Sequence, residues 1–261
     1  MRFFEVLTKK QHRQLLIELT RREIKQRYKQ SVLGYVWVIL NPLAQMVVMS
    51  FVFSYVFRPG NLGVPYPIFL FVALLPWSLF SQSMQMATNS LVENSGLLSK
   101  IYFPREVLIL SAITAKIVDF FLALVIFIIM MISFKIPLTT NVFWVIPIFL
   151  IQVTLTYGIT LLTAAANLFY RDIQYLLNLL LLVWMYLTPI MYPTEIFPAK
   201  FQWVFKVNPM AVLVNAYREA VLAGGMPNLV SLSIASFVSV ILVIVGFKVF
   251  KKLEGQFADA V

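Results

Sequence analysis

The chain has 261 residues, of which 61% are hydrophobic and only 12% charged, and its formal net charge is +10. Soluble domains carry about 25% charged residues, so this composition excludes a soluble globular protein and predicts a polytopic membrane protein. The lack of cysteine excludes disulfides, thiolate metal sites and thiol chemistry. We therefore predict an all-α fold, a single membrane domain over residues 1–261, and neither a metal site nor catalytic residues in this chain.

The first 29 residues hold nine of the 21 lysines and arginines. Arg21, Lys25 and Lys29 repeat every four residues and form one basic stripe on a helix, beside a less polar stripe that contains Leu16 and Ile24. This pattern predicts an amphipathic helix on the membrane surface, with its cations among lipid headgroups and its less polar side against the acyl chains.

We assign residues 1–32 to a cytoplasmic arm that contains this interface helix. A basic cluster beside a first span indicates cytoplasmic retention more often than nucleic-acid binding, so we expect membrane lipids and no nucleic acid as partners. The opening residues lack the apolar core and cleavage site of a removable signal peptide, and the first span is expected to direct insertion.

Six apolar stretches follow, each long enough to cross a hydrocarbon core of roughly 30 Å. With both termini in the cytoplasm, 15 cations fall on the cytoplasmic side and five on the outer side, as the positive-inside rule favours. The six-span bundle covers residues 33–247, and a cytoplasmic tail covers residues 248–261. We place the spans at residues 33–57, 68–91 (interrupted at 75–77), 107–134, 142–168, 173–192 and 229–247.

The cytoplasmic loop at residues 92–106 carries apolar residues at its tip, which a plain connection between spans does not need. Asn94 or Ser95 can cap a short helix there, and Pro104 would end it. Such a cluster indicates docking into a groove of a partner or burial among headgroups, and we favour docking. The predicted docking residues are Leu97, Leu98, Ser99, Lys100, Ile101, Tyr102 and Phe103.

Lys116 and Asp119 form the one ionisable pair within a predicted span, three residues apart on one helix face. We interpret them as a structural pair, with a proton relay as the alternative. A proton-coupled or sodium-coupled carrier usually has more such groups, and a membrane hydrolase or transferase needs paired carboxylates or an activated nucleophile. The sequence also lacks a GxxxxGK[ST] phosphate loop, so any ATP hydrolysis must come from a partner.

Residues 193–228 are too polar for a span and too apolar for an exposed loop. Apolar residues repeat every four positions from Phe197 to Phe205 and again from Met210 to Val221, which predicts two short amphipathic helices. Irregular backbone at membrane depth is tolerated only beside protein or a water-filled cavity, so we expect a periplasmic gate. The predicted gate residues are Phe197, Phe201, Phe205 and Tyr217.

Aromatic residues make up 15% of the chain, and interface belts and core packing explain most of them. A subset could line a conduit, since flat rings with polar edges suit the faces of sugar rings. The candidates are Trp37, Trp77, Phe80, Trp184 and Tyr186.

Four segments in series resemble the permease subunit of ABC exporters of O-antigen, teichoic acid or capsule polysaccharides. They are RYKQSVLGYVWVILNPL, SKIYFPREVLILSAI, NLFYRDIQYLL, and LTPIMYP with the following VNPMAVLVNAYRE. The resemblance implies a homodimer of six-span permeases in the bacterial inner membrane. It also implies two separate ATP-binding subunits, which hold ATP and Mg²⁺, while the permease itself has no cofactor and is not an enzyme.

The resemblance further implies roles for three segments: an interface helix at about 15–29, a coupling helix at about 95–103 in a cleft of the ATPase, and gate helices within 193–225. Its substrate would be a polyprenyl-pyrophosphate-linked glycan that enters from the cytoplasm and leaves through a channel between the protomers. The basic stripe would meet that pyrophosphate or, as we favour, ordinary headgroups. The alternatives are an ABC exporter of a small molecule or lipid, and a proton-coupled carrier that uses Lys116 and Asp119.

Overall fold

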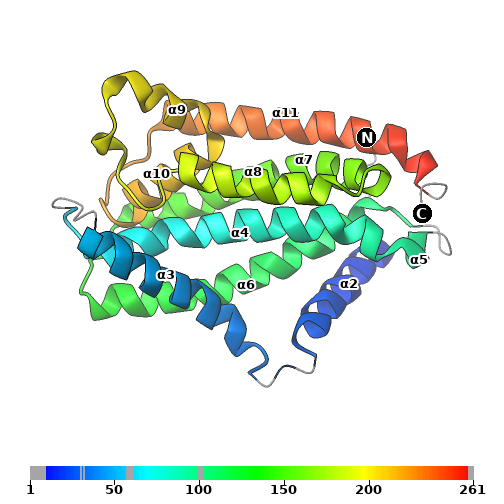
Figure 1. Cartoon of the computed structure of the whole chain (residues 1–261), viewed down its shortest axis with the longest axis horizontal. Coiled ribbons are helices and arrows are strands. Elements are labelled where there is room, and N and C mark those ends of the chain that lie inside the picture. Colours follow the sequence, from blue (N-terminus) through cyan, green and yellow to red (C-terminus); the bar gives the residue numbers. More distant parts are fainter. Residues whose placement is uncertain (1–9, 30, 32, 57–61, 99–102, 258–261) are drawn as a thin grey trace.

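The structure is a computed structural model that describes residues 10–29, 31, 33–56, 62–98 and 103–257. All regular structure in these residues is helical, which confirms the predicted all-α class (Figure 1). The start of α2 (Lys10–Tyr28), the short α5 (Ser95–Leu98) and the end of α11 (Leu229–Leu253) lie at one end of the molecule. The helices α9 (Gln202–Val207) and α10 (Pro209–Val221) lie at the other end (Figure 1).

Within the described residues, five helices are long and apolar enough to cross a membrane. The remaining apolar helix, α8 (Ile173–Leu187), has 15 residues and is about 22 Å long, less than the roughly 30 Å of a hydrocarbon core. The predicted count of six spans depends on this helix and stays a prediction. The five long helices are α3 (Val36–Val56), α4 (Tyr66–Glu93), α6 (Glu106–Ser133), α7 (Val145–Phe169, preceded by the 3-10 turn η1 at Thr140–Trp144) and α11.

The helix α4 is the centre of the bundle and packs against α3, α6, α7, α8 and α10. Apolar side chains on all sides of it belong to the main core cluster, from Ile68 to Phe80. A helix that is hydrophobic all round can be surrounded by protein or by lipid, and the neighbours of α4 show that protein surrounds it.

The helices α7 and α11 pack along one another over much of their length. Gly158 and Gly246 lie where the two backbones approach most closely. A Cβ atom on Gly158 would lie 2.7 Å from the backbone nitrogen of Val243, and one on Gly246 would lie 2.6 Å from the carbonyl oxygen of Gly158. Small residues at such positions let membrane helices approach closely, because association in lipid depends on packing.

The predicted interruption of the second span at residues 75–77 is wrong, since α4 continues through Pro76. Proline is tolerated in membrane helices where neighbouring groups satisfy the local backbone. Pro76 lacks the N–H that would bond the carbonyl of Val72, four residues earlier. Separately, Gln152 Nε2 of α7 donates to the carbonyl oxygen of Pro76 itself at 2.7 Å, which ties α4 to α7.

Two other predicted boundaries differ from the structure. The fifth apolar stretch leaves the helical conformation after Leu187 rather than at Tyr192. Thr188 is extended, with φ −100° and ψ 131°, as a residue directly before a proline should be. In the opposite direction, α11 continues past the predicted end at Phe247 to Leu253, into the predicted tail.

The segment between α8 and α11 confirms one predicted amphipathic helix and contradicts the other. In α10, all four periodic residues (Met210, Leu213, Tyr217 and Val221) are buried. The first repeat does not form one helix. It consists of the 3-10 turns η2 (Thr194–Ile196) and η3 (Ala199–Phe201) and the six residues of α9, because extended residues at Phe197 and Pro198 separate the turns.

Candidate functional site

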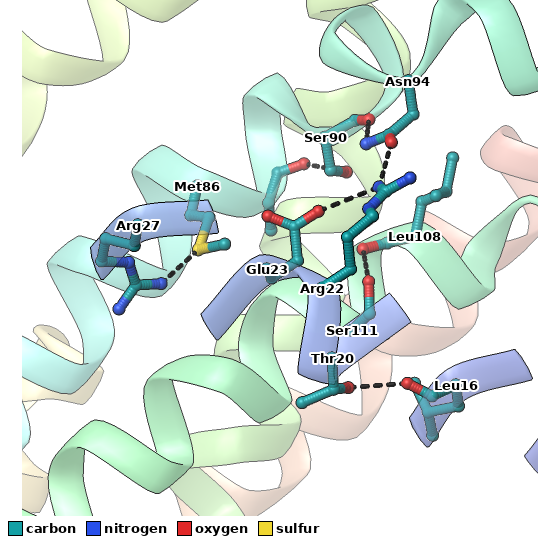
Figure 2. Close-up of polar contacts among 11 residues, drawn as sticks. Leu16, Thr20, Arg22, Glu23, Arg27, Met86, Ser90, Asn94, Leu108 and Ser111 are labelled. Atoms are coloured by element: carbon teal, nitrogen blue, oxygen red, sulfur yellow. Dashed lines mark hydrogen bonds and ion pairs between the residues drawn. The ribbon is translucent and has the colours of Figure 1, made fainter. Parts of the chain in front are cut away.

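The less polar side of α2 packs against the protein. Leu19 and Thr20 are buried, Leu16 packs partly buried against the cluster that contains Leu108 of α6, and α2 lies along α6. Thr20 Oγ1 donates to the carbonyl oxygen of Leu16 at 2.7 Å, which satisfies its buried hydroxyl (Figure 2). The acyl-chain contact predicted for this side therefore does not apply to these residues, because α6 covers them.

The predicted basic stripe of Arg21, Lys25 and Lys29 is exposed. Together with Glu18 and Tyr35 it lines an open depression of about 560 Å³, and Arg21 pairs with Glu18 at 2.9 Å. Exposed cations on a membrane protein suit anionic groups. Binding of this stripe to headgroups or to a pyrophosphate stays a prediction.

The opposite edge of α2 is joined to α4 and α5 through Asn94 (Figure 2). The guanidinium of Arg22 donates to the side-chain oxygen of Asn94, whose amide donates to the carbonyl oxygen of Ser90 at 2.8 Å. The backbone oxygen of Asn94 accepts from the backbone N–H of Leu97 at 2.9 Å, at the start of α5. One residue thus links the helix α2, the end of α4 and the predicted docking element.

Of the seven predicted docking residues, Leu97, Leu98 and Phe103 are described, and only α5 is helical there. Leu98 is buried, and Leu97 and Phe103 pack partly buried against the second core cluster. Gly96 is the exposed residue of α5, and a Cβ atom there would have nothing within 4 Å. The other predicted docking residues, Ser99, Lys100, Ile101 and Tyr102, lie outside the described residues.

A cluster of charged residues joins the start of α6 to the end of α11. Glu106 is buried and accepts from Lys251 Nζ at 2.8 Å, and the same amino group reaches Glu254 at 2.9 Å. Arg105 donates to the carbonyl oxygen of Glu254 and lies 5.6 Å from the ring centroid of the buried Phe257. The loop that carries the predicted docking residues is therefore held to α11 as well as to α2 and α4.

The predicted pairing of Lys116 and Asp119 is confirmed, with Lys116 Nζ 3.2 Å from Asp119 Oδ2. The same carboxylate oxygen accepts from Arg27, at the C-terminal end of α2. Arg27 also donates to the sulfur of Met86 at 3.1 Å (Figure 2). Lys116 Nζ has a further acceptor in Gln82 Oε1 at 2.8 Å. The charge pair therefore fastens α2 to the interior of the bundle, which the sequence analysis missed.

Three of the five predicted conduit aromatics form one packed cluster inside the chain. Trp77 and Phe80 are buried with ring centroids 5.7 Å apart, and Trp184 meets Phe80 edge-on at 5.1 Å. The other two, Trp37 on α3 and Tyr186 on α8, are exposed. A channel lined by any of them stays a prediction.

The structure brings two of the four predicted gate residues together. The rings of Phe197 and Phe205 lie 5.3 Å apart, edge to face, with Tyr192 packed on both. Phe201 is exposed, with Lys200 Nζ 5.0 Å from its ring centroid. Tyr217 is buried in the main core, where its hydroxyl donates to Gln152 Oε1 at 3.0 Å.

Arg218 of α10 is a buried cation held by backbone oxygens. Its guanidinium donates to the carbonyls of Pro189, of Ile190 at 2.7 Å and of Phe69 at 3.4 Å, and it lies 3.7 Å from the centroid of the Phe69 ring. Burial lowers the pKa of Arg218 to about 9, so it stays charged at neutral pH. It fastens the turn after α8 to α4. Arg218 is one of the five cations that the positive-inside prediction places on the outer side. Its position directly after Tyr217, in a helix with a periodic apolar face, was a usable signal of burial.

Residues 14–222 match the ABC-2 type transporter family. The chain belongs to this family. The ABC-2 match begins within α2, ends just after α10 and includes every predicted site residue. Among the described residues of this ABC-2 chain, no group of three or more His, Cys, Asp or Glu side chains could hold a metal ion.

Similar proteins cover nearly the whole ABC-2 chain. An O-antigen export system permease protein RfbA of Klebsiella pneumoniae is 34% identical over 247 residues, which is 94% of each chain. The protein of the same name from Myxococcus xanthus is 32% identical over 254 residues, 96% of each chain. The polysialic acid transport protein KpsM of Escherichia coli is 24% identical over 234 residues, 89% of this chain and 91% of the relative.

Proposed function

We propose that this chain is the transmembrane permease subunit of an ATP-driven exporter. Its cargo is a lipid-linked polysaccharide of the O-antigen or teichoic acid type, which crosses the bacterial inner membrane through a channel between two permease protomers. The observation that supports this most strongly is similarity over at least 94% of the chain to O-antigen export permeases from two organisms. The permease is not an enzyme, because ATP and Mg²⁺ bind to a separate pair of subunits.

The mechanism uses α5 as the docking element for the ATP-binding subunit, on the cytoplasmic side with both chain termini. Closure of the two ATP-binding subunits moves α5, and the helices bonded to α5 move with it. The hydrogen bonds of Asn94 join it to α2 and α4, and the pair of Glu106 with Lys251 joins the start of α6 to α11. Exposed Trp37 and Tyr186 lie on surfaces that a second protomer completes, and the Phe197–Phe205 cluster closes the periplasmic end.

Two other transport functions share parts of this architecture. An ABC exporter of a small molecule or lipid would have the same helices and the same docking element, and would differ in the width of its conduit. A proton-coupled carrier would need Asp119 to exchange protons. The same oxygen of Asp119 accepts from both Lys116 and Arg27, so the carboxylate joins α6 to α2, which favours a structural role.

The docking role of α5 can be tested with Gly96→Arg, which adds a long cation to the exposed face of α5. A side chain there meets nothing within 4 Å, so the fold is expected to stay intact. We expect co-purification of the ATP-binding subunit to fall at least about tenfold, because a blocked, charged contact at an interface centre typically costs 2 kcal/mol or more. The amount of polysaccharide at the surface of the same cells is expected to fall as well.

Gly255→Arg is the matched control. Gly255 lies beyond α11 at the same end of the molecule, and a side chain there also meets nothing within 4 Å. Normal complex formation is expected for this variant. Wild-type co-purification and export in Gly96→Arg would rule out α5 as the docking element.

A further inference from the structure

A cavity of about 280 Å³ lies between α2, α3, α4 and α6. In Figure 1, α2 and α3 form the two arms of a V beside α6. Lys116 is ten residues into α6, about 15 Å from its first residue at 1.5 Å per residue. The cavity therefore lies partway along the bundle, in the half nearer α5. Its polar lining consists of Arg27, Asn41, Ser78, Gln82, Lys116 and Asp119.

The charged residues that line this cavity are not balanced. Arg27 and Lys116 both approach one oxygen of Asp119, and all three side chains are at most 24% exposed. The charged side chains that line the cavity are thus two cations and one carboxylate, and Arg27 has contacts beyond this group. Cations at this depth are costly in a membrane protein, and an anion in the cavity offsets part of that cost.

The remaining walls define what kind of anion fits. Trp37, Val38 and Pro42 of α3 and Leu79 and Phe120 of the inner helices give the cavity apolar sides next to the charged cluster. The exposed residues of α3 are themselves mostly apolar, Trp37 included. A ligand that matches both surfaces has an anionic head and a hydrocarbon tail.

We propose that this cavity binds the phosphate group of a membrane lipid, with Lys116 and Arg27 as the principal ligands. A guanidinium fork and an ammonium are the side chains that bind phosphate oxygens best, and Asn41 and the indole of Trp37 add neutral donors. Asp119 sets the two cations in place rather than binding the anion. This site is separate from the exposed stripe of Arg21, Lys25 and Lys29, which lines a different depression.

The phosphate has two possible sources: an anionic phospholipid, or the polyprenyl diphosphate that carries the cargo. The second source depends on the proposed function, and the first does not. The test is a titration of the purified full-length chain in detergent, with bound lipid counted by native mass spectrometry. The probes are phosphatidylglycerol, farnesyl diphosphate, and diacylglycerol as the phosphate-free control.

We expect phosphatidylglycerol or farnesyl diphosphate to bind with at least about tenfold higher affinity than diacylglycerol, since charge-assisted hydrogen bonds provide the difference. Tighter binding of phosphatidylglycerol identifies a phospholipid site, and tighter binding of farnesyl diphosphate identifies a site for the cargo carrier. Equal binding of all three lipids overturns the proposal. This comparison uses the wild-type chain and tests for a phosphate preference, and the variants below assign that preference to this cavity or to the exposed stripe.

Variants then locate the binding. Lys116→Gln is expected to weaken binding of the phosphate lipid about tenfold and Lys116→Arg to retain it. Arg171→Gln, which removes an exposed cation that lines neither depression, is expected to leave the affinity unchanged. Unchanged affinity in Lys116→Gln contradicts the assignment to this cavity. Lipid binding without polysaccharide export would count against the proposed function alone, and export with no lipid preference would count against this inference alone.

Discussion

In this protein a more apolar helix is not a more deeply buried one, as a comparison of α4 with α11 shows. Of the five long helices, α4 is the least hydropathic and α11 shares the highest hydropathy, yet 78% of the α4 window is buried and only 22% of the α11 window. Lipid chains are as apolar as a protein core, so a helix exposed to lipid can be uniformly apolar. Polar side chains whose hydrogen bonds must be satisfied lie inside, as Thr88 and Ser90 of α4 do.

The largest effect is expected where α11 does touch the bundle closely. Gly158→Leu places a side chain against the backbone of Val243 and Leu242, with no flexible neighbour able to move away. We expect a loss of at least about 3 kcal/mol in the free energy of unfolding, or no folded protein at all. Thermal unfolding in detergent measures it, with Gly255→Leu, which meets nothing within 4 Å, as the neutral control. Equal melting temperatures for these two variants would show that α7 and α11 do not pack as described.

A matched pair of phenylalanines tests the contrast between the two helices directly. Phe71 of α4 is fully buried and its ring centroid lies 6.0 Å from that of Phe127, whereas Phe237 of α11 is 66% exposed. We expect Phe71→Ala to cost about 3 kcal/mol through the cavity that it creates, and Phe237→Ala less than about 0.5 kcal/mol. The comparison of denaturation midpoints checks this. A large cost for Phe237→Ala would mean that a second protein covers α11.

The smallest expected effect concerns the polar interior. Gln152 joins α7 to Pro76 of α4 and to Tyr217 of α10 through its two amide atoms. Gln152→Leu should cost about 1 kcal/mol, the usual scale of hydrogen bonds between membrane helices, while Gln45→Leu on the exposed side of α3 should cost nothing measurable. A double-mutant cycle with Tyr217→Phe isolates the Tyr217 hydrogen bond. If the effects of the two substitutions on the free energy of unfolding are strictly additive, this hydrogen bond contributes no coupling energy.

The positions of the long helices were predictable because charge-free runs of 20 or more residues have few other interpretations. The ends of these helices were less predictable. Pro189 marks the end of α8, since Thr188 before it is extended, yet Pro76 does not interrupt α4, the helix that packs against most of the others. Whether a helix continues through a proline depends on tertiary packing, which the local sequence does not contain.

The candidate sites also contain some features that the local sequence predicts and others that depend on tertiary packing. Lys116 and Asp119 were predictable as a pair, since they are three residues apart on one helix. Arg27 was not, because a local partner already satisfied the carboxylate and nothing in the sequence called for a second cation 92 residues away. The inward position of Leu98 and the core position of Tyr217 were equally hidden, since periodicity identifies the apolar face of a helix and not what covers it.

The arrangement around Arg218 has a consequence for biogenesis. The carbonyl groups that accept from it belong to Phe69, Pro189 and Ile190, and each of them precedes Arg218 in the chain. During translation from the N-terminus, every acceptor is therefore made before the guanidinium emerges from the ribosome. The pairing of this cation therefore needs no segment that is synthesised later than Arg218 itself.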